Sequence, residues 1–167
     1  MPFSLLPTLV ADGVTDISPN LLRQRGIRLL MLDFDNTIIP YTTNVPAAEV
    51  AQWLEGIKAV GIPVCVVSNS RNDRVPAFCR RYGLDCILRS KKPFPVGIPK
   101  CLEKYGVPAK DALMVGDQIF TDTLGGNLAG TQTLLVKPIN NHNFWLKARH
   151  LLEQPFISLA RKRRITL

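Results

Sequence analysis

The chain has 167 residues, of which 46% are hydrophobic and 20% are charged. This balance is enough for one folded domain with a buried core, and it argues against disorder over the body of the chain. Twenty-one Lys and Arg against 13 Asp and Glu give a formal net charge of +8. A basic protein favours anionic partners such as phosphoesters, acidic lipid headgroups or nucleic acid.

No Lys or Arg precedes Arg23, so the first residues lack the layout of a secretory signal. No apolar run approaches the roughly 20 residues that a membrane-spanning helix needs. We therefore expect a cytoplasmic protein, either in solution or held peripherally at the inner face of a membrane. The cysteines form no CxxC pair, which predicts reduced thiols in the core. They are Cys65, Cys79, Cys86 and Cys101.

Five short apolar runs alternate with stretches that resemble helices. The runs span residues 27–33, 62–68, 85–89, 112–117 and 133–137. This alternation predicts an α/β fold with a parallel sheet and crossover helices. Because the runs are continuously apolar, helices should cover both faces of the sheet. We therefore expect a doubly wound, Rossmann-like, five-stranded parallel sheet without a cap domain.

Glycine and capping residues mark the expected helices between these strands. One helix is predicted over 47–60, after Pro46 and before Gly61. A second should begin after Asn72 or Asp73 and end at Gly83. The third is predicted near 96–105, and the fourth begins between 120 and 123 and ends near 130.

Residues 143–167 form a basic, amphipathic tail after the expected core of residues 27–137 in a single domain of residues 1–167. We expect one or two helices here, with Pro155 breaking the apolar pattern. The tail ends in the basic residues Arg161, Lys162, Arg163 and Arg164. Such a segment can dock on an anionic membrane, or it can pack on the sheet with a solvated basic end.

Polar residues follow several of the predicted strands. In an open α/β sheet, ligands bind beyond the carboxyl ends of the strands, so these residues predict one shared site. They are Asp33, Asp35 and Thr37, then Ser68 and Asn69, then Lys91 and Lys92, and finally Asp117 and Asp122. Taken singly, each group has an ordinary structural explanation as a turn, a helix cap or a solvated lysine.

The residue types suit phosphate chemistry. Asp33 and Asp35 lie two positions apart after a buried strand. One of these carboxylates can attack the substrate or bind a metal, while the other transfers protons. The Ser68 hydroxyl can hold phosphate oxygens together with nearby backbone N–H groups. Asp117 and Asp122 supply the hard oxygen ligands that magnesium prefers.

Taken together, the order Asp-x-Asp-x-Thr, Ser-Asn, Lys-Pro and Gly-Asp-Gln-x-x-Thr-Asp resembles the haloacid dehalogenase superfamily of phosphatases over about residues 27–136. The resemblance implies that Asp33 is the nucleophile and a magnesium ligand. Asp35 would be the general acid and base, and its backbone carbonyl would also bind the metal. Thr37 would brace this loop beside the phosphate, which Ser68 and Asn69 would bind.

The resemblance also assigns the later motifs. Lys92, directly before a proline, would neutralise charge on the nucleophile and the phosphate, with Lys91 as the alternative. Asp117 would bind the metal, and Asp122 would either bind it or orient metal-bound water. The implied cofactor is Mg²⁺ and the implied substrate is a phosphomonoester.

The motif sequences are similar to those of the YqeG-like branch, which is grouped with phosphatidylglycerophosphate phosphatases. Phe34 stands where that branch commonly has a basic residue, which bears on substrate specificity. About 35 residues separate Asp33 from Ser68 and about 24 separate Ser68 from Lys92, too few for a folded cap beside a helix and a strand. An open site would accept a bulky phosphate such as the headgroup of phosphatidylglycerophosphate.

Two other hypotheses stay open at this point. The enzyme could act on a soluble phosphoester, a phosphoprotein or a nucleic-acid terminus, although we expect no nucleic-acid partner because no recognisable nucleic-acid module is present. Alternatively, the chain could be a receiver-like phosphate sensor or an inactive binding domain. A receiver would carry its acidic pair on the first strand and its phosphorylated aspartate on a later one, and this sequence matches neither.

Overall fold

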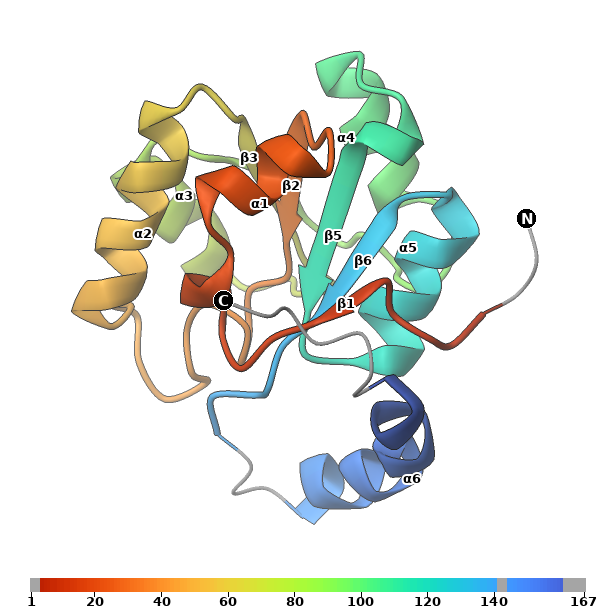
Figure 1. Ribbon diagram of the computed structural model, residues 1–167. Coiled ribbons are helices and arrows are strands. Elements are labelled where there is room, and N and C mark those ends of the chain that lie inside the picture. Colours follow the sequence, from red (N-terminus) through yellow and green to blue (C-terminus); the bar gives the residue numbers. More distant parts are fainter. Residues whose placement is uncertain (1–3, 141–143, 161–167) are drawn as a thin grey trace.

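The computed structural model of the chain describes residues 4–140 and 144–160. These residues contain six parallel strands in the order β1-β6-β5-β2-β3-β4 (Figure 1). The strands are β1 (Leu9–Val10), β2 (Leu29–Leu32), β3 (Val64–Val67), β4 (Asp85–Ile87), β5 (Ala112–Gly116) and β6 (Gln132–Leu135). The predicted parallel α/β sheet is confirmed, and β1 adds a sixth strand that is too short to leave a sequence pattern.

The helices lie where the glycines and caps predicted, with one addition near the N-terminus. They are α1 (Pro19–Gln24), α2 (Ala48–Ala59), α3 (Arg74–Tyr82), α4 (Gly97–Tyr105), α5 (Leu124–Ala129) and α6 (Phe144–Ala160). Gly83 and Gly130 end α3 and α5 in the left-handed conformation, which glycine adopts without a steric penalty. The helix α1 was not among the predicted elements, although the Ser18 side chain caps it and Pro19 is its first residue.

Alternate residues of the central strand β2 enter two separate cores. Leu30 and Leu32 belong to a cluster that includes residues of α1, α2 and α3. Leu29 and Met31 belong to a second cluster that includes Ile98 and other residues of α4. Helices therefore cover both faces of the sheet, as the continuously apolar strands predicted.

The order in which strands are added to the sheet changes side at β2. After β2 the chain builds β3 and β4 on one side, and it then crosses to build β5 and β6 on the other. The carboxyl end of β2, between those of β3 and β5, is therefore the topological switch point at which open α/β sheets bind ligands. Between β2 and β3 the described chain contains α2, and between β3 and β4 it contains α3, so neither connection carries a cap domain.

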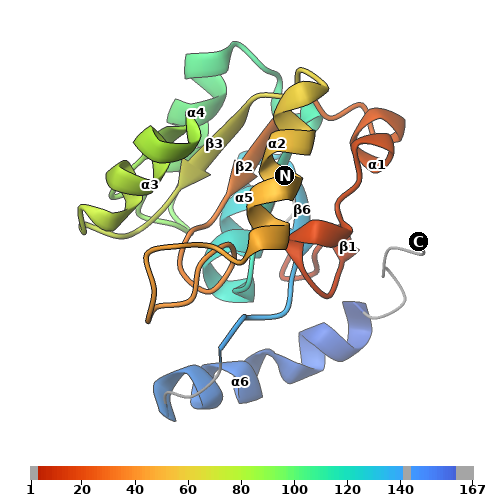
Figure 2. The same ribbon diagram turned by 90° about the vertical axis from the view of Figure 1, so that its left-hand side faces the viewer.

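The last helix, α6, lies beyond the end of the sheet toward which the strand arrowheads point (Figures 1 and 2). It is one helix that continues through Pro155, which decides between the one or two helices expected for this tail. The Phe156 ring packs against Phe120 with centroids 6.2 Å apart, and Glu153 accepts a hydrogen bond from the backbone N–H of Ile119 at 2.9 Å. Residues 161–164, the basic end of the predicted tail, lie outside the described residues.

Among the described residues, we find no helix with the length and apolar character that crossing a bilayer requires.

Candidate active site

Asp33 is the first residue beyond β2, and the sheet fixes its position. Its backbone N–H donates to the carbonyl of Val115 on β5 at 2.8 Å, which extends the hydrogen bonding between β2 and β5 by one residue. The residue is 7% exposed. Its carboxylate therefore sits at the carboxyl edge of the sheet with little access to water.

The loop after Asp33 turns sharply at Asn36, which has a φ of 64°. Asparagine tolerates this left-handed conformation better than most residues. The Asn36 N–H donates to the carbonyl of Ile39 at 2.7 Å, and its side chain donates to the carbonyl of Asn140 at 2.8 Å. The turn is thus tied to the segment that follows β6, and it directs Thr37 back toward Asp33.

Thr37 lies between two of the predicted site carboxylates. Its hydroxyl is 3.5 Å from Oδ2 of Asp33 and 3.4 Å from Oδ1 of Asp117, in position to donate to either. The residue is buried, so this hydroxyl braces the loop after β2 against the end of β5.

Asp117 and Asp122 come from the end of β5 and from the helical turn that follows it. The turn η3 (Ile119–Thr123) is a single turn of π-helix, a local widening that is frequent at functional sites. It carries Asp122 back over Gly116, where a Cβ would lie only 2.2 Å from the Asp122 carboxylate. Glycine is therefore required at position 116 for this approach.

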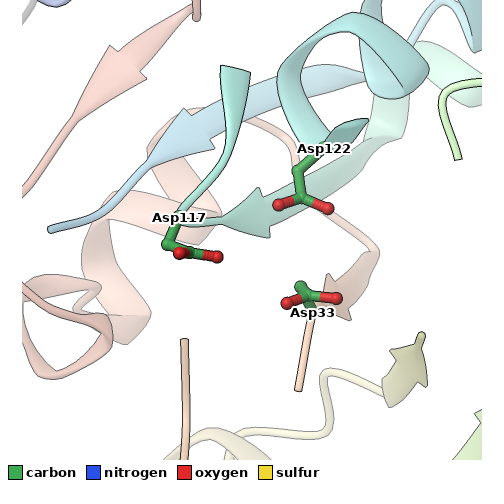
Figure 3. A group of neighbouring side chains, drawn as sticks. All are labelled: Asp33, Asp117 and Asp122. Atoms are coloured by element: carbon green, nitrogen blue, oxygen red, sulfur yellow. The ribbon is translucent and has the colours of Figure 1, made fainter. Parts of the chain in front are cut away.

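Three buried carboxylates converge at this edge of the sheet. One ligand oxygen from each of Asp33, Asp117 and Asp122 lies within 4.8 Å of the other two. Figure 3 shows the three side chains approaching one another from β2, from the end of β5 and from η3. Such a set of hard oxygen donors fits a divalent cation such as Mg²⁺, because a cation would offset the repulsion among buried like charges.

Lys92 supplies the positive charge in this group. Its ammonium donates to Oδ1 of Asp33 at 2.7 Å, contacts Oδ1 of Asp122 at 2.8 Å and donates to the carbonyl of Val67 at 2.6 Å. These contacts occupy its three donors, and its side chain is only 1% exposed. Lys91, the alternative lysine in the sequence analysis, is exposed and has a φ of 58°.

The electrostatics of the group follow from burial and pairing. Burial alone would lower the pKa of Lys92, but Asp122 and Asp33 outweigh it and raise that pKa above its ordinary value. Burial raises the pKa of Asp122 to about 6, with Lys92 opposing the shift and Asp33 adding to it. The lysine is thus held as a cation within the acidic group.

Ser68 and Asn69 follow β3 and face the loop that carries Lys92. The Asn69 side chain accepts from the backbone N–H of Lys92 at 2.8 Å and donates to its carbonyl at 2.9 Å. It also accepts from the Ser90 hydroxyl at 2.7 Å. The Ser68 hydroxyl accepts from the N–H of Ser70 at 3.0 Å. Asn69 therefore positions the lysine loop by bonding its backbone.

Asp35 is the predicted site residue that stands apart from the buried group. Its side chain is 22% exposed and forms an ion pair with Arg74, with Nη1 3.2 Å from Oδ1. Burial and the nearby Asp33 raise the pKa of Asp35, while Arg74 and Lys92 oppose that shift. Arg74 was not among the predicted site residues, because its contact with Asp35 joins positions that are 39 residues apart.

Phe34, the departure from the branch pattern, belongs to the core. It is 1% exposed, and its ring meets the Phe78 ring edge to face with centroids 5.3 Å apart. The guanidinium of Arg74 lies over this ring, 5.5 Å from its centroid.

Comparison with known proteins finds similarity to one family of hydrolases. Residues 90–143 match the family model described as HAD-hydrolase-like, where HAD stands for haloacid dehalogenase. Over 159 residues the chain is 28% identical to the probable phosphatase YqeG of Bacillus subtilis, covering 95% of this chain and 92% of that protein. The chain is thus similar to phosphatases of the haloacid dehalogenase superfamily over most of its length.

Two further matches extend the comparison. The chain is 29% identical over 164 residues to phosphatidylglycerophosphate phosphatase 1 of Arabidopsis thaliana, covering 92% of this chain but only 44% of the plant protein. Its fold is similar to the cobalt-bound deoxy-D-mannose-octulosonate 8-phosphate phosphatase of Haemophilus influenzae. That match has a TM-score of 0.55 at 12% identity and covers 77% of this chain and 89% of the other.

Proposed function

We propose that this protein is a phosphatase of the haloacid dehalogenase type, a Mg²⁺-dependent phosphomonoester hydrolase that forms an aspartyl phosphate on Asp33. The observation that carries the proposal is the convergence of Asp33, Asp117 and Asp122 around the buried ammonium of Lys92. A buried nucleophilic carboxylate beside a fixed cation suits attack on an anionic phosphoryl group.

In the first step an oxygen of the Asp33 carboxylate attacks phosphorus, and the bond between phosphorus and the ester oxygen breaks. Asp35, entering as the carboxylic acid, gives its proton to the departing oxygen, so an alcohol leaves. Asp33 now carries the phosphoryl group as an acyl phosphate. The Lys92 ammonium, 2.7 Å from Asp33, offsets negative charge beside the reacting atoms.

In the second step Asp35, now a carboxylate, takes a proton from a water molecule whose oxygen attacks phosphorus. The bond between phosphorus and Asp33 breaks, which releases inorganic phosphate and restores the carboxylate of Asp33 and the acid form of Asp35. The raised pKa of Asp35 favours its cycling between these two forms.

The remaining residues hold the phosphate and the metal. Ser68 and Asn69 at the end of β3, with Thr37 beside Asp33, are the proposed phosphate-binding residues. Asp33, Asp117 and the backbone carbonyl of Asp35 would hold Mg²⁺, with Asp122 as a further ligand or as an acceptor for metal-bound water. When bound, the metal supplies charge neutralisation at the phosphoryl oxygens.

Release of inorganic phosphate from 4-nitrophenyl phosphate, with and without EDTA, tests this proposal. Asp33→Asn should abolish turnover, while Asp111→Asn, which alters a carboxylate at the opposite edge of the sheet, should keep it. EDTA should stop the wild-type reaction and added Mg²⁺ should restore it. Multiple turnovers by Asp33→Asn would overturn the assigned nucleophile, full activity in EDTA would overturn the metal, and a stoichiometric phosphoprotein without turnover would indicate a receiver.

We further propose that the phosphate is presented on a lipid headgroup such as that of phosphatidylglycerophosphate, at the cytoplasmic face of a membrane. The named activity of the plant relative supports this substrate. The absence of a cap from the connections around β3 supports it too, because an open site accepts a bulky substrate.

The surface around the site also supports a lipid. Exposed apolar side chains lie on the loops after β2, β4 and β6 and on α6, all at the edge of the sheet that holds the site. We call this set the apolar rim; it consists of Tyr41, Val45, Phe94, Ile139, Leu152 and Leu159. An apolar surface on a protein with a net charge of +8 favours contact with anionic lipid.

Phosphate release from phosphatidylglycerophosphate in vesicles, compared with soluble phosphomonoesters, tests the substrate. A kcat/KM for the lipid well above those for soluble esters is expected. Faster hydrolysis of a soluble ester, a phosphopeptide or a nucleic-acid terminus would replace the lipid with that substrate and leave the phosphatase mechanism intact.

A further inference from the structure

Arg74 is the first residue of α3, and its side chain reaches across to the loop after β2. Its Nη1 lies 3.2 Å from Oδ1 of Asp35, and its Nε donates to Oδ1 of Asn44 at 2.8 Å. Its Nη2 donates to the carbonyl of Pro40 at 3.0 Å and also to that of Thr43. One guanidinium thus holds both a carboxylate and the loop that follows it.

The donor count argues against a direct role in binding phosphate. Arginine has five N–H donors, and these contacts occupy four of them. The guanidinium also packs over the ring of the buried Phe34, with Cζ of Arg74 5.5 Å from the ring centroid. Arg74 is therefore fixed from several sides and turned toward Asp35.

Asp35 needs such a partner because it is placed differently from the other site carboxylates. Asp33 and Asp122 are both held by the buried Lys92, whereas the Asp35 side chain is 22% exposed. A general acid must lie within hydrogen-bond reach of the departing oxygen. A fixed arginine fork restricts the positions that this carboxylate can take.

We propose that Arg74 is a positioning residue that aims the Asp35 carboxyl group at the leaving-group oxygen. The inference rests on the proposed function, in which Asp35 protonates that oxygen. It assigns Arg74 no contact with the reacting atoms. Loss of Arg74 should therefore impair the protonation of the leaving group more than any other part of the reaction.

Two substrates of similar shape separate this role from a purely structural one. The 4-nitrophenolate ion leaves with little help from an acid, whereas phenolate depends on protonation more strongly. The measured quantity is the ratio of kcat/KM for phenyl phosphate to kcat/KM for 4-nitrophenyl phosphate. Because kcat/KM reports the steps up to loss of the alcohol, hydrolysis of the aspartyl phosphate does not obscure it.

Arg74→Ala should lower this ratio on the order of tenfold, given that general acids contribute factors of about 10² to 10⁴. Asp35→Asn should lower the ratio at least as far, and the double variant should lower it no further than Asp35→Asn alone. Asn44→Ala is the matched control, because it removes a loop contact of Arg74 without touching Asp35. It should leave the ratio unchanged.

An equal loss of kcat/KM on both esters in Arg74→Ala would overturn the inference, because it would mean that Arg74 only stabilises the loop after β2. If Arg74→Ala does not fold, Arg74→Lys serves instead. It keeps the charge and the aliphatic stem but cannot hold Asp35 and the loop together, so the ratio should still fall. A wild-type protein inactive on both esters would overturn the proposed function, whereas an active wild type with an unchanged ratio in the Arg74 variants would overturn this inference alone.

Discussion

At the scale of single residues, the site depends on one lysine that pairs with two carboxylates away from water. The three donors of Lys92 are directed to Asp33, Asp122 and the carbonyl of Val67. Removing one partner of a buried ionic group leaves an uncompensated charge, which is far more costly than losing a surface ion pair. Lys92 should therefore affect both stability and activity.

Lys92→Met tests this double role. Without the ammonium, Asp33 and Asp122 face each other as buried charges, so the free energy of unfolding should fall by roughly 3–5 kcal/mol. Activity should fall by at least about 10²-fold, because the charge beside the transferring phosphoryl group is gone. Urea denaturation in EDTA and phosphate release measure the two effects. Lys91→Met is the matched control, since Lys91 is exposed, and an equal effect there would contradict the assignment.

Gly116→Ala tests the close approach of η3 to the end of β5. The added Cβ would lie 2.2 Å from Oδ2 of Asp122, so this carboxylate must move away from Lys92. We expect a stability loss of about 1–3 kcal/mol together with a large loss of kcat/KM for 4-nitrophenyl phosphate. Gly56→Ala, in open space on α2, should retain full activity. Normal kinetics in Gly116→Ala would show that the position of Asp122 is not critical.

At the scale of elements, α6 is attached to the turn that carries Asp122. The carboxylate of Glu153 is 1% exposed and accepts from the N–H of Ile119, the first residue of η3. The first N–H groups of a helical turn have no partner within the turn, so a side chain from another element can satisfy one of them. The C-terminal helix thus supports the geometry of the site without contributing a proposed catalytic group.

Glu153→Ala should therefore destabilise the protein and disturb η3. Leaving the buried N–H of Ile119 without its acceptor should cost about 1–3 kcal/mol of unfolding free energy, measured by urea denaturation. Leu152→Ala, on the exposed side of the same helix, should change the stability by less than about 0.5 kcal/mol. Equal stability of the two variants would mean that α6 does not depend on this contact.

The sequence predicted the long elements well because their signals are local. Apolar runs marked β2, β3 and β5, and glycines marked the ends of α3 and α5. The two-residue strand β1 has no such signal, because only its pairing with β6 defines it. The sequence left one or two helices open for the tail because proline usually ends a helix. The packing of Phe156 on Phe120 favours the single continuous helix that the structure shows.

The site residues were recognisable because their spacing matches a family pattern and parallel strands bring their carboxyl ends together. The structure brings Asp33, Asp117, Asp122 and Lys92 into one group. The partners of Asp35 were not predictable in the same way. Arg74 reaches Asp35 across 39 positions of sequence, and no local pattern indicates which arginine will turn back across a loop.

At the scale of the whole molecule, a net positive charge accompanies an apolar surface on the face that holds the candidate site. The chain has a net charge of +8, and the apolar rim lies on loops and a helix at the carboxyl edge of the sheet. Phe94, Leu152 and Leu159 are the most exposed members, at 67%, 68% and 66%. If this face meets a lipid surface, inserted rim side chains would bring the site to a headgroup phosphate.

Replacing Phe94, Leu152 and Leu159 together with serine separates lipid contact from chemistry. The variant should retain most of its kcat/KM for 4-nitrophenyl phosphate, because none of these side chains is a proposed catalytic or metal-binding group. Its activity on phosphatidylglycerophosphate in anionic vesicles should fall on the order of tenfold, and so should its co-sedimentation with them, because the loss of each inserted apolar side chain weakens binding to lipid.

Leu128→Ser is the control, because Leu128 is exposed near the end of α5, where the chain returns to the opposite edge of the sheet. Equal vesicle activity in the triple variant and the wild type would mean that the apolar rim does not contact lipid.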